Sequence, residues 1–185
     1  MRGYGIILAV ATVVTFLLTF AARIIAVRCA LVARPDERRV HDRPTPLGGG
    51  AAMFVAFLVA MAVASHIPQF RQVFRGSTDP LGVVLAASMI FAVGLLDDLR
   101  DVSAPAKLAG QVFAASILYL FGVTLLYFRV PFFGIVSLSN DLEPLVTVIW
   151  VAAIANAVNL IDGLDGLAAG IVAIAAGSFF LYSDR

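Results

Sequence analysis

The sequence predicts an all-α polytopic membrane protein with about six transmembrane helices and an outside N-terminus. Apolar residues make up 61% of the 185 residues and charged residues 14%, and the mean hydropathy is +0.98. This balance is far from that of a soluble domain. A transmembrane helix needs about 20 mostly apolar residues, and the chain holds several such runs. We therefore treat residues 1–185 as a single transmembrane helical domain.

Composition also excludes several functions. The net charge of +1 gives no basic face of the kind that nucleic-acid binding requires. The only cysteine, Cys29, excludes an intrachain disulfide and a Cys-rich metal site, and two histidines argue against a histidine-based zinc site. The first apolar run, 3–27, is longer than the roughly 7 to 15 apolar residues of a signal peptide, so we expect a retained helix.

Hydropathy and turn residues together indicate where the spans lie. Prolines occur at or near the expected boundaries, where a missing N–H and a fixed φ do least harm. The third and sixth spans are the shortest. The expected spans are 3–27, 47–67, 81–96, 106–128, 144–161 and 167–182.

The orientation follows from arginines in the loops. Five arginines follow the first span, whereas the N-terminus has only Arg2. The positive-inside rule therefore places the first loop in the cytoplasm, although Arg71 and Arg75 in the next loop favour the reverse. By parity, the loops after spans one, three and five share the cytoplasmic face. These loops contain "ERRVHDRPTPLGGG" (37–50), "DDLRDVSAPAK" (97–107) and "NLIDGLDG" (159–166).

Carboxylates in these loops point to a divalent cation. Asp97 and Asp98 end the third span and Asp162 ends the fifth, where the partial negative charge of a helix C-terminus disfavours them. Magnesium would relieve this repulsion, and one or two carboxylates with a substrate phosphate suffice to bind it. The alternative for any single acid is a solvated loop residue, and Asp165 in particular fits the N-cap of the sixth helix.

Cationic and amide side chains complete the polar set. Lys107 begins the fourth helix, whose N-terminus favours an anion. Asn156 and Asn159 lie one turn apart and are expected to face inward. His41 belongs to a dense donor group in the first loop, for which a positive-inside anchor is the alternative. Acids for a metal, cations for phosphates and a membrane location indicate a cytosolic phosphorylated substrate that meets a lipid phosphate.

Three segments resemble a known family. "RRVHDRPTPLGGG", "GLLDDLRDVSAPAKLAGQ" and "NAVNLIDGLDGLAAG" are similar to three successive cytoplasmic motifs of the polyprenyl-phosphate N-acetylhexosamine-1-phosphate transferases, the MraY/WecA/TagO superfamily of glycosyltransferase family 4. The "PTPLGG" form resembles the WecA/TagO branch. The resemblance implies transfer of N-acetylglucosamine 1-phosphate from a UDP-sugar to undecaprenyl phosphate, with release of UMP. It further implies a Mg²⁺ cofactor (Mn²⁺ as an alternative), cell-envelope biosynthesis and the bacterial inner membrane.

The resemblance also implies roles for individual residues. Asp97 is the candidate base that keeps the lipid phosphate deprotonated, and Asp98 is its partner near metal and phosphate. Lys107 holds phosphate, while His41 and Arg43 match the first motif more loosely. The residues expected to line the nucleotide and metal site are Asn156, Asn159, Asp162 and Asp165, and the expected metal ligands are Asp98, Asp162 and Asp165.

One departure from the family pattern affects what we expect of the chain alone. Family members have further spans, whose loops supply another metal-binding aspartate and a His-rich motif. Because these are lacking here, the chain resembles the N-terminal part of such an enzyme. We expect completion by a C-terminal half, a second polypeptide or a homodimer, or else inactivity of the chain alone.

Two other functions remain as alternatives. "DDLRD" (97–101) also fits the magnesium motif of membrane prenyltransferases. Asp162 and Asp165 are three residues apart, however, whereas the second motif of those enzymes resembles DxxxD. A non-catalytic membrane subunit or ion pathway would need acids near mid-membrane, and here they cluster at one boundary.

Overall fold

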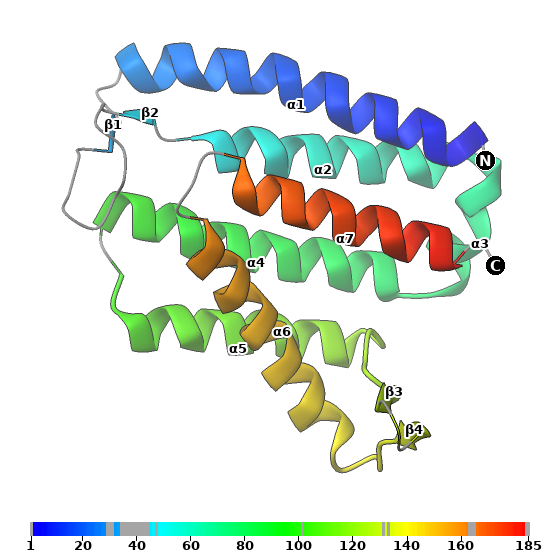
Figure 1. Ribbon diagram of the computed structural model, residues 1–185. Helices are drawn as coiled ribbons and strands as arrows, with labels where there is room; N and C mark the ends of the chain where they lie inside the picture. The colour runs from blue at the N-terminus through cyan, green and yellow to red at the C-terminus, as the bar shows by residue number, and fades with distance from the viewer. Residues whose placement is uncertain are drawn as a thin grey trace.

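A computed structural model describes residues 2–28, 32–33, 45–46, 48–100, 102–130, 132, 134–162 and 166–183. Its main elements are helices that run largely side by side (Figure 1). Two short elements, η1 (Pro68–Phe70) and α3 (Arg71–Gly76), connect the second long helix to the third. The six long helices are α1 (Arg2–Arg28), α2 (Gly49–His66), α4 (Asp79–Arg100), α5 (Ala104–Leu120), α6 (Glu143–Ile161) and α7 (Leu167–Ser183).

The helices have the length and composition of membrane spans. In the described part of the chain, α1, α2, α4 and α6 are long and apolar enough to cross a membrane, and α5 and α7 are apolar helices of 17 residues each. That length lies at the lower limit of about 17 to 25 residues for a transmembrane helix. The prediction of an all-α polytopic membrane protein is confirmed.

Four of the six expected spans match helices to within two residues at each end, but the third does not. The expected span 81–96 is wrong at its C-terminal end, because α4 runs from Asp79 to Arg100. Hydropathy falls at the acidic pair, whereas backbone hydrogen bonding continues through it. The backbone N–H of Val102 then donates to Oδ1 of Asp97 at 3.0 Å, so the acidic side chain itself closes the helix end.

The fourth expected span, 106–128, is wrong at its C-terminal end. Helix α5 stops at Leu120 because Gly122 adopts φ +94°. The N–H of Gly122 donates to the Tyr119 carbonyl (3.0 Å) and that of Val123 to the Leu118 carbonyl (2.9 Å), which is the Schellman arrangement that ends helices. The expected span therefore extends eight residues beyond the helix, past the turn at Gly122 and into the first residues of an antiparallel hairpin. The hairpin strands are β3 (Tyr127–Val130) and β4 (Gly134–Ser137).

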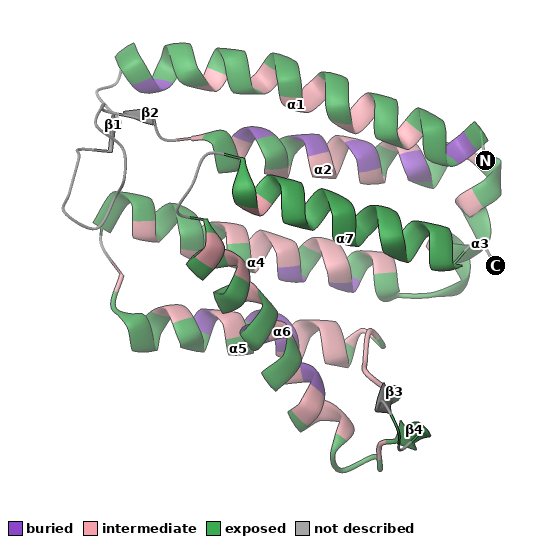
Figure 2. Ribbon diagram, in the orientation of Figure 1, coloured by how far each residue is buried: buried purple, intermediate pink, exposed green. Residues whose placement is uncertain are grey.

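Small residues let the helices approach one another closely. In α2 the alanines at positions 52, 56, 60 and 64 are buried at four-residue spacing, and this helix packs against the antiparallel α1 (Figure 1). Such stripes of small residues are typical of helix packing in membranes. Most outward surfaces are exposed, and α7 is exposed along nearly its whole length (Figure 2).

The helix ends that flank the three motifs lie toward one end of the bundle. They are the end of α1, the start of α2, the end of α4, the start of α5, the end of α6 and the start of α7 (Figure 1). The N-terminus and the end of α7 lie at the opposite end. Between α1 and α2 in the sequence, two short strands pair antiparallel: β1 (Val32–Ala33) with β2 (Thr45–Pro46). The arrangement agrees with the parity deduced from six spans.

Candidate active site

A pocket of about 290 Å³ lies where α2, α4 and α6 meet. Gly48 and Gly50 line it from the first motif, Asp97 and Asp98 from the second, and Asn159 from the third. Segments that are more than a hundred residues apart in the sequence therefore share one cavity. Its apolar lining includes Phe91, which stacks on Phe54 with a centroid distance of 4.3 Å and an interplanar angle of 7°.

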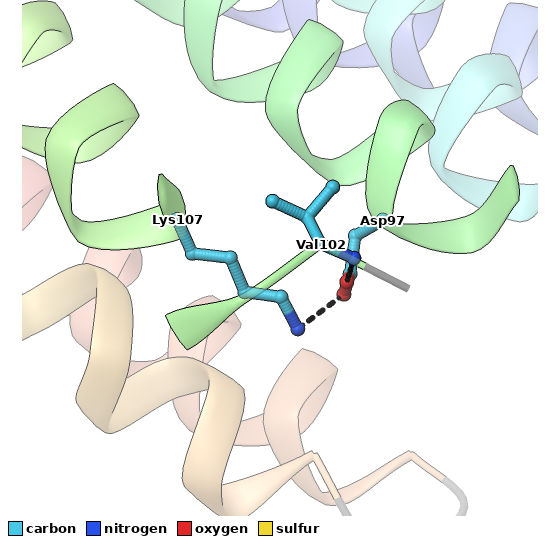
Figure 3. Close-up of polar contacts among 3 residues, drawn as sticks. All are labelled: Asp97, Val102 and Lys107. Carbon is cyan, nitrogen blue, oxygen red and sulfur yellow. Dashed lines mark hydrogen bonds and ion pairs between the residues drawn. The ribbon is translucent and has the colours of Figure 1, made fainter. Parts of the chain in front are cut away.

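The best-defined polar contact in the site joins Asp97 to Lys107. Oδ2 of Asp97 lies 2.7 Å from Nζ of Lys107, and Oδ1 accepts the N–H of Val102 (Figure 3). The two side chains are 32% and 37% exposed, respectively. A cation therefore compensates the carboxylate at the C-terminal end of α4, where the helix dipole disfavours negative charge.

The local sequence explains how Lys107 reaches this position. Pro105 lies in the first turn of α5, where its missing N–H costs nothing. The N–H of Lys107 donates to the carbonyl of Ser103 at 3.0 Å, so the lysine belongs to the first helical turn as the sequence predicted. Because α4 and α5 are antiparallel neighbours, a side chain at the start of α5 can reach back to the last turn of α4.

The close approach of α4 and α5 depends on a glycine one turn below the ion pair. Gly110 is buried, and a Cβ atom at this position would overlap the Val93 side chain. Val93 precedes Asp97 by one turn, and Gly110 follows Lys107 by nearly one turn. The Gly110–Val93 contact therefore sets the separation of the two helices next to the Asp97–Lys107 pair.

The two asparagines of the third motif have different surroundings. Asn159 lines the pocket. Asn156, one turn earlier, instead donates from Nδ2 to Oε1 of Gln111 on α5 (2.6 Å) and to the Ala152 carbonyl (2.8 Å). Gln111 was missed by sequence reasoning, although a polar side chain one turn after Lys107 in an apolar helix was a usable signal.

Asp162 lies at the C-terminal end of α6 as predicted. It is exposed, and it is not among the residues that line the pocket in the described part of the chain. Three other predicted site residues, His41, Arg43 and Asp165, lie outside the described residues, as does Asp101 of the "DDLRD" segment. Their roles remain predictions.

The donor set in the pocket fits one kind of metal site. Over the ranges that the structure describes, no group of three or more His, Cys, Asp or Glu side chains is placed to hold a metal ion. Asp97, Asp98 and Asn159, whose side chains carry oxygen atoms, nevertheless line a single cavity. Such a set suits Mg²⁺, which is usually bound by one or two carboxylates together with water and substrate phosphates. The residues fit a cation shared with a substrate.

Fold and site together define a polytopic helical membrane protein with a polar site, built from acids, an amide and a lysine, at one end of its bundle. Residues 80–184 match the family model described as glycosyl transferase family 4. The chain belongs to this family. The "DDLRD" segment lies inside the matched region, so the prenyltransferase alternative loses its main support.

Relatives of known name cover nearly all of this chain. It is 38% identical over 185 residues to the decaprenyl-phosphate N-acetylglucosaminephosphotransferase of Mycolicibacterium smegmatis. This match covers 99% of this chain and 46% of the relative. It is 34% identical over 165 residues to the probable undecaprenyl-phosphate N-acetylglucosaminyl 1-phosphate transferase of Bacillus subtilis (89% of this chain, 44% of the relative).

A relative whose name gives a different activity is also similar. The chain is 40% identical over 162 residues to the phospho-N-acetylmuramoyl-pentapeptide-transferase of Desulforudis audaxviator, over 77% of this chain and 48% of the relative. No solved structure matches the chain. The chain spans about half the length of the curated relatives it matches.

Proposed function

We propose that the protein transfers N-acetylglucosamine 1-phosphate from UDP-N-acetylglucosamine to a polyprenyl phosphate such as undecaprenyl phosphate, with release of UMP. The observation that carries this proposal is the Asp97–Lys107 ion pair, whose carboxylate lines the same pocket as Asp98 and Asn159. The names of the Mycolicibacterium and Bacillus relatives support a polyprenyl phosphate as the acceptor and N-acetylglucosamine as the sugar.

In the proposed reaction, an oxygen of the lipid phosphate attacks the β-phosphorus of the UDP-sugar. A new P–O bond forms, the bond between the α- and β-phosphates breaks, and UMP leaves with that electron pair. Asp97 acts as the base that keeps the attacking phosphate ionised, a role that needs a carboxylate within hydrogen-bond reach of the phosphate.

Lys107 positions the phosphate in this proposal. Its ammonium group has three N–H donors, so it can retain Asp97 while it donates to a phosphate oxygen. Charge stabilisation and positioning account for most catalysis of phosphoryl transfer. Because the ammonium lies 2.7 Å from the carboxylate of Asp97, a phosphate bound to Lys107 would lie next to the base.

We also propose that the site uses Mg²⁺, with Mn²⁺ as an alternative. When bound, the ion would neutralise charge on the diphosphate. Asp98 and Asn159 supply oxygen atoms from the pocket lining. Asp162 and Asp165, which follow Asn159 in the same motif, are proposed to contribute ligands.

The proposed location is the bacterial inner membrane, with the active face toward the cytoplasm. Asp97 and Asp98 lie in the last turn of α4 and Lys107 in the first turn of α5, so the site is at a helix boundary. A water-soluble nucleotide sugar and a lipid headgroup can meet only at such a boundary. The arginine-rich first loop supports the cytoplasmic side.

The test is UMP release by the full-length protein in lipid nanodiscs, with UDP-N-acetylglucosamine and undecaprenyl phosphate as substrates. We expect turnover that depends on both substrates and that is lost in Asp98→Asn. Asp79→Asn is the matched control, because Asp79 is an exposed aspartate at the opposite end of the same helix. Equal activity in both variants, or UMP release without a polyprenyl phosphate, would overturn the proposal.

A further inference from the structure

Helix α6 carries Asn159 to the pocket, and α5 is its main neighbour in the bundle. It crosses α5 obliquely, whereas the other long helices run nearly side by side (Figure 1). Near its start, the buried Thr147 accepts the N–H of Leu125 through Oγ1 at 3.0 Å. This contact fixes the end of α6 that lies away from the pocket.

The end near the pocket is held by an amide pair. Nδ2 of Asn156 donates to Oε1 of Gln111 at 2.6 Å and to the Ala152 carbonyl at 2.8 Å, which uses both hydrogens of that amide nitrogen. Within the described residues, this is the one side-chain hydrogen bond between α5 and α6. Polar side chains that bond across helices are a main source of specific packing in apolar surroundings.

The amide pair is in register with the site. Gln111 lies four residues after Lys107 on α5, and Asn156 lies three residues before Asn159 on α6. Residues three or four apart share a helix face. The hydrogen bond is therefore one turn farther along the two helices from the site than these two residues, and it connects the helix that carries Lys107 to the helix that carries Asn159.

We propose that Gln111 is a positioning residue for the transfer reaction. Through Asn156 it fixes the rotation and approach of α6, and so it keeps Asn159 against the acidic pair of α4. This inference rests on the proposed function, and it assigns Asn156 to interhelical attachment in addition to the substrate contact expected from the motif. Removal of either partner leaves the other amide without its interhelical bond, whereas removal of both leaves no unpaired group.

The first experiment measures geometry and needs no turnover. In the full-length protein with Cys29→Ser, spin labels are placed at Leu108 on α5 and Leu160 on α6, both exposed. We expect a narrow distance distribution in this background and a broadened or shifted one in Gln111→Leu. Ser116→Ala is the matched control, because Ser116 bonds only to Val112 of its own helix. Identical distributions in all three proteins would overturn the proposal.

The second experiment measures kinetics in unlabelled protein. We expect Gln111→Leu to raise KM for UDP-N-acetylglucosamine by about tenfold and to change KM for undecaprenyl phosphate less than about twofold. Gln111→Glu retains an oxygen acceptor for Asn156 and should recover most of the loss. The Gln111→Leu, Asn156→Leu double variant should be no worse than Asn156→Leu. Multiplicative losses in the double variant, or equal changes in both KM values, would contradict positioning.

The two experiments separate this inference from the proposed function. If the parent protein releases no UMP while the label distances still depend on Gln111, the proposed function fails and the interhelical role of Gln111 stands. If UMP is released normally and the distances and kinetics do not respond to Gln111→Leu, the positioning role fails and the proposed function stands.

Discussion

Nζ of Lys107 lies 2.7 Å from Oδ2 of Asp97, and this contact joins the first turn of α5 to the last turn of α4. Each side chain keeps about a third of its surface exposed, 37% and 32%. Ion pairs this accessible to solvent contribute about 0–1 kcal/mol to stability. The contribution to folding is therefore small, and the pair should matter far more for chemistry than for the free energy of unfolding.

Asp97→Asn tests this difference directly. The amide oxygen can still accept the Val102 N–H, but the base is lost. We expect transfer to fall by about 10²–10⁴-fold, while the free energy of unfolding changes by less than about 1 kcal/mol. UMP release and thermal unfolding in detergent measure the two effects. Activity within a few-fold of the parent would show that Asp97 only accepts the Val102 N–H at the end of α4 and is not the base.

Lys107→Met removes the charge and keeps a similar unbranched side chain. We expect a decrease in turnover of about 10²–10³-fold, as for loss of one group that stabilises transition-state charge, with Lys107→Arg less impaired. Arg75→Met serves as control, because Arg75 is an exposed cation on α3, far from the pocket in the chain fold. A similar loss in both Met variants would point to a general effect of charge.

Gly110→Ala should separate α4 from α5. The added Cβ would overlap the Val93 side chain, and overpacking typically costs about 1–3 kcal/mol. We expect a lower unfolding temperature together with reduced transfer, because the displaced helices carry Asp97 and Lys107. Gly177→Ala on α7 meets no atom within 4 Å and should be neutral or slightly stabilising. An unchanged unfolding temperature for Gly110→Ala would show that Val93 can move aside.

Membrane orientation is testable with cysteines introduced into exposed connections. In a Cys29→Ser background, a cysteine at Ser103 should be shielded from a membrane-impermeant thiol reagent in intact cells. A cysteine at Ser77, at the opposite end of α4, should react. The reverse pattern would place the pocket on the outer face and contradict an outside N-terminus.

Magnesium dependence is the test of the proposed cation. EDTA should stop UMP release, and excess Mg²⁺ should restore it, because Mg²⁺ is usually held by one or two carboxylates together with water and substrate phosphates. The Asp97→Asn protein should stay inactive after Mg²⁺ is restored. Turnover that continues unchanged in EDTA would leave Asp98 and Asn159 without the proposed metal role.

Much of the architecture could be predicted because hydropathy reports directly on lipid exposure. The ends of α1, α2, α6 and α7 lie within two residues of the predicted spans. The predicted span ends were wrong where something other than hydropathy decides where a helix ends. Helix α4 continues through Asp97 and Asp98 because backbone bonding does not require apolar side chains, and α5 stops at Leu120 because Gly122 adopts a positive φ. The expected span continued to residue 128 because most residues between Gly122 and Phe128 are apolar.

Composition, loop charge and parity were enough to predict the class of protein and to place the three polar motifs toward one end of the bundle, since these properties depend on residues counted along the chain. Which polar side chains meet depends on helix rotation and separation, which single positions control. Gly110 allows α5 to approach α4, so Lys107 reaches Asp97. Gln111 binds Asn156, which leaves Asn159 as the asparagine that lines the pocket. Neither contact follows from spacing, because helix packing is decided by side-chain shape across the interface.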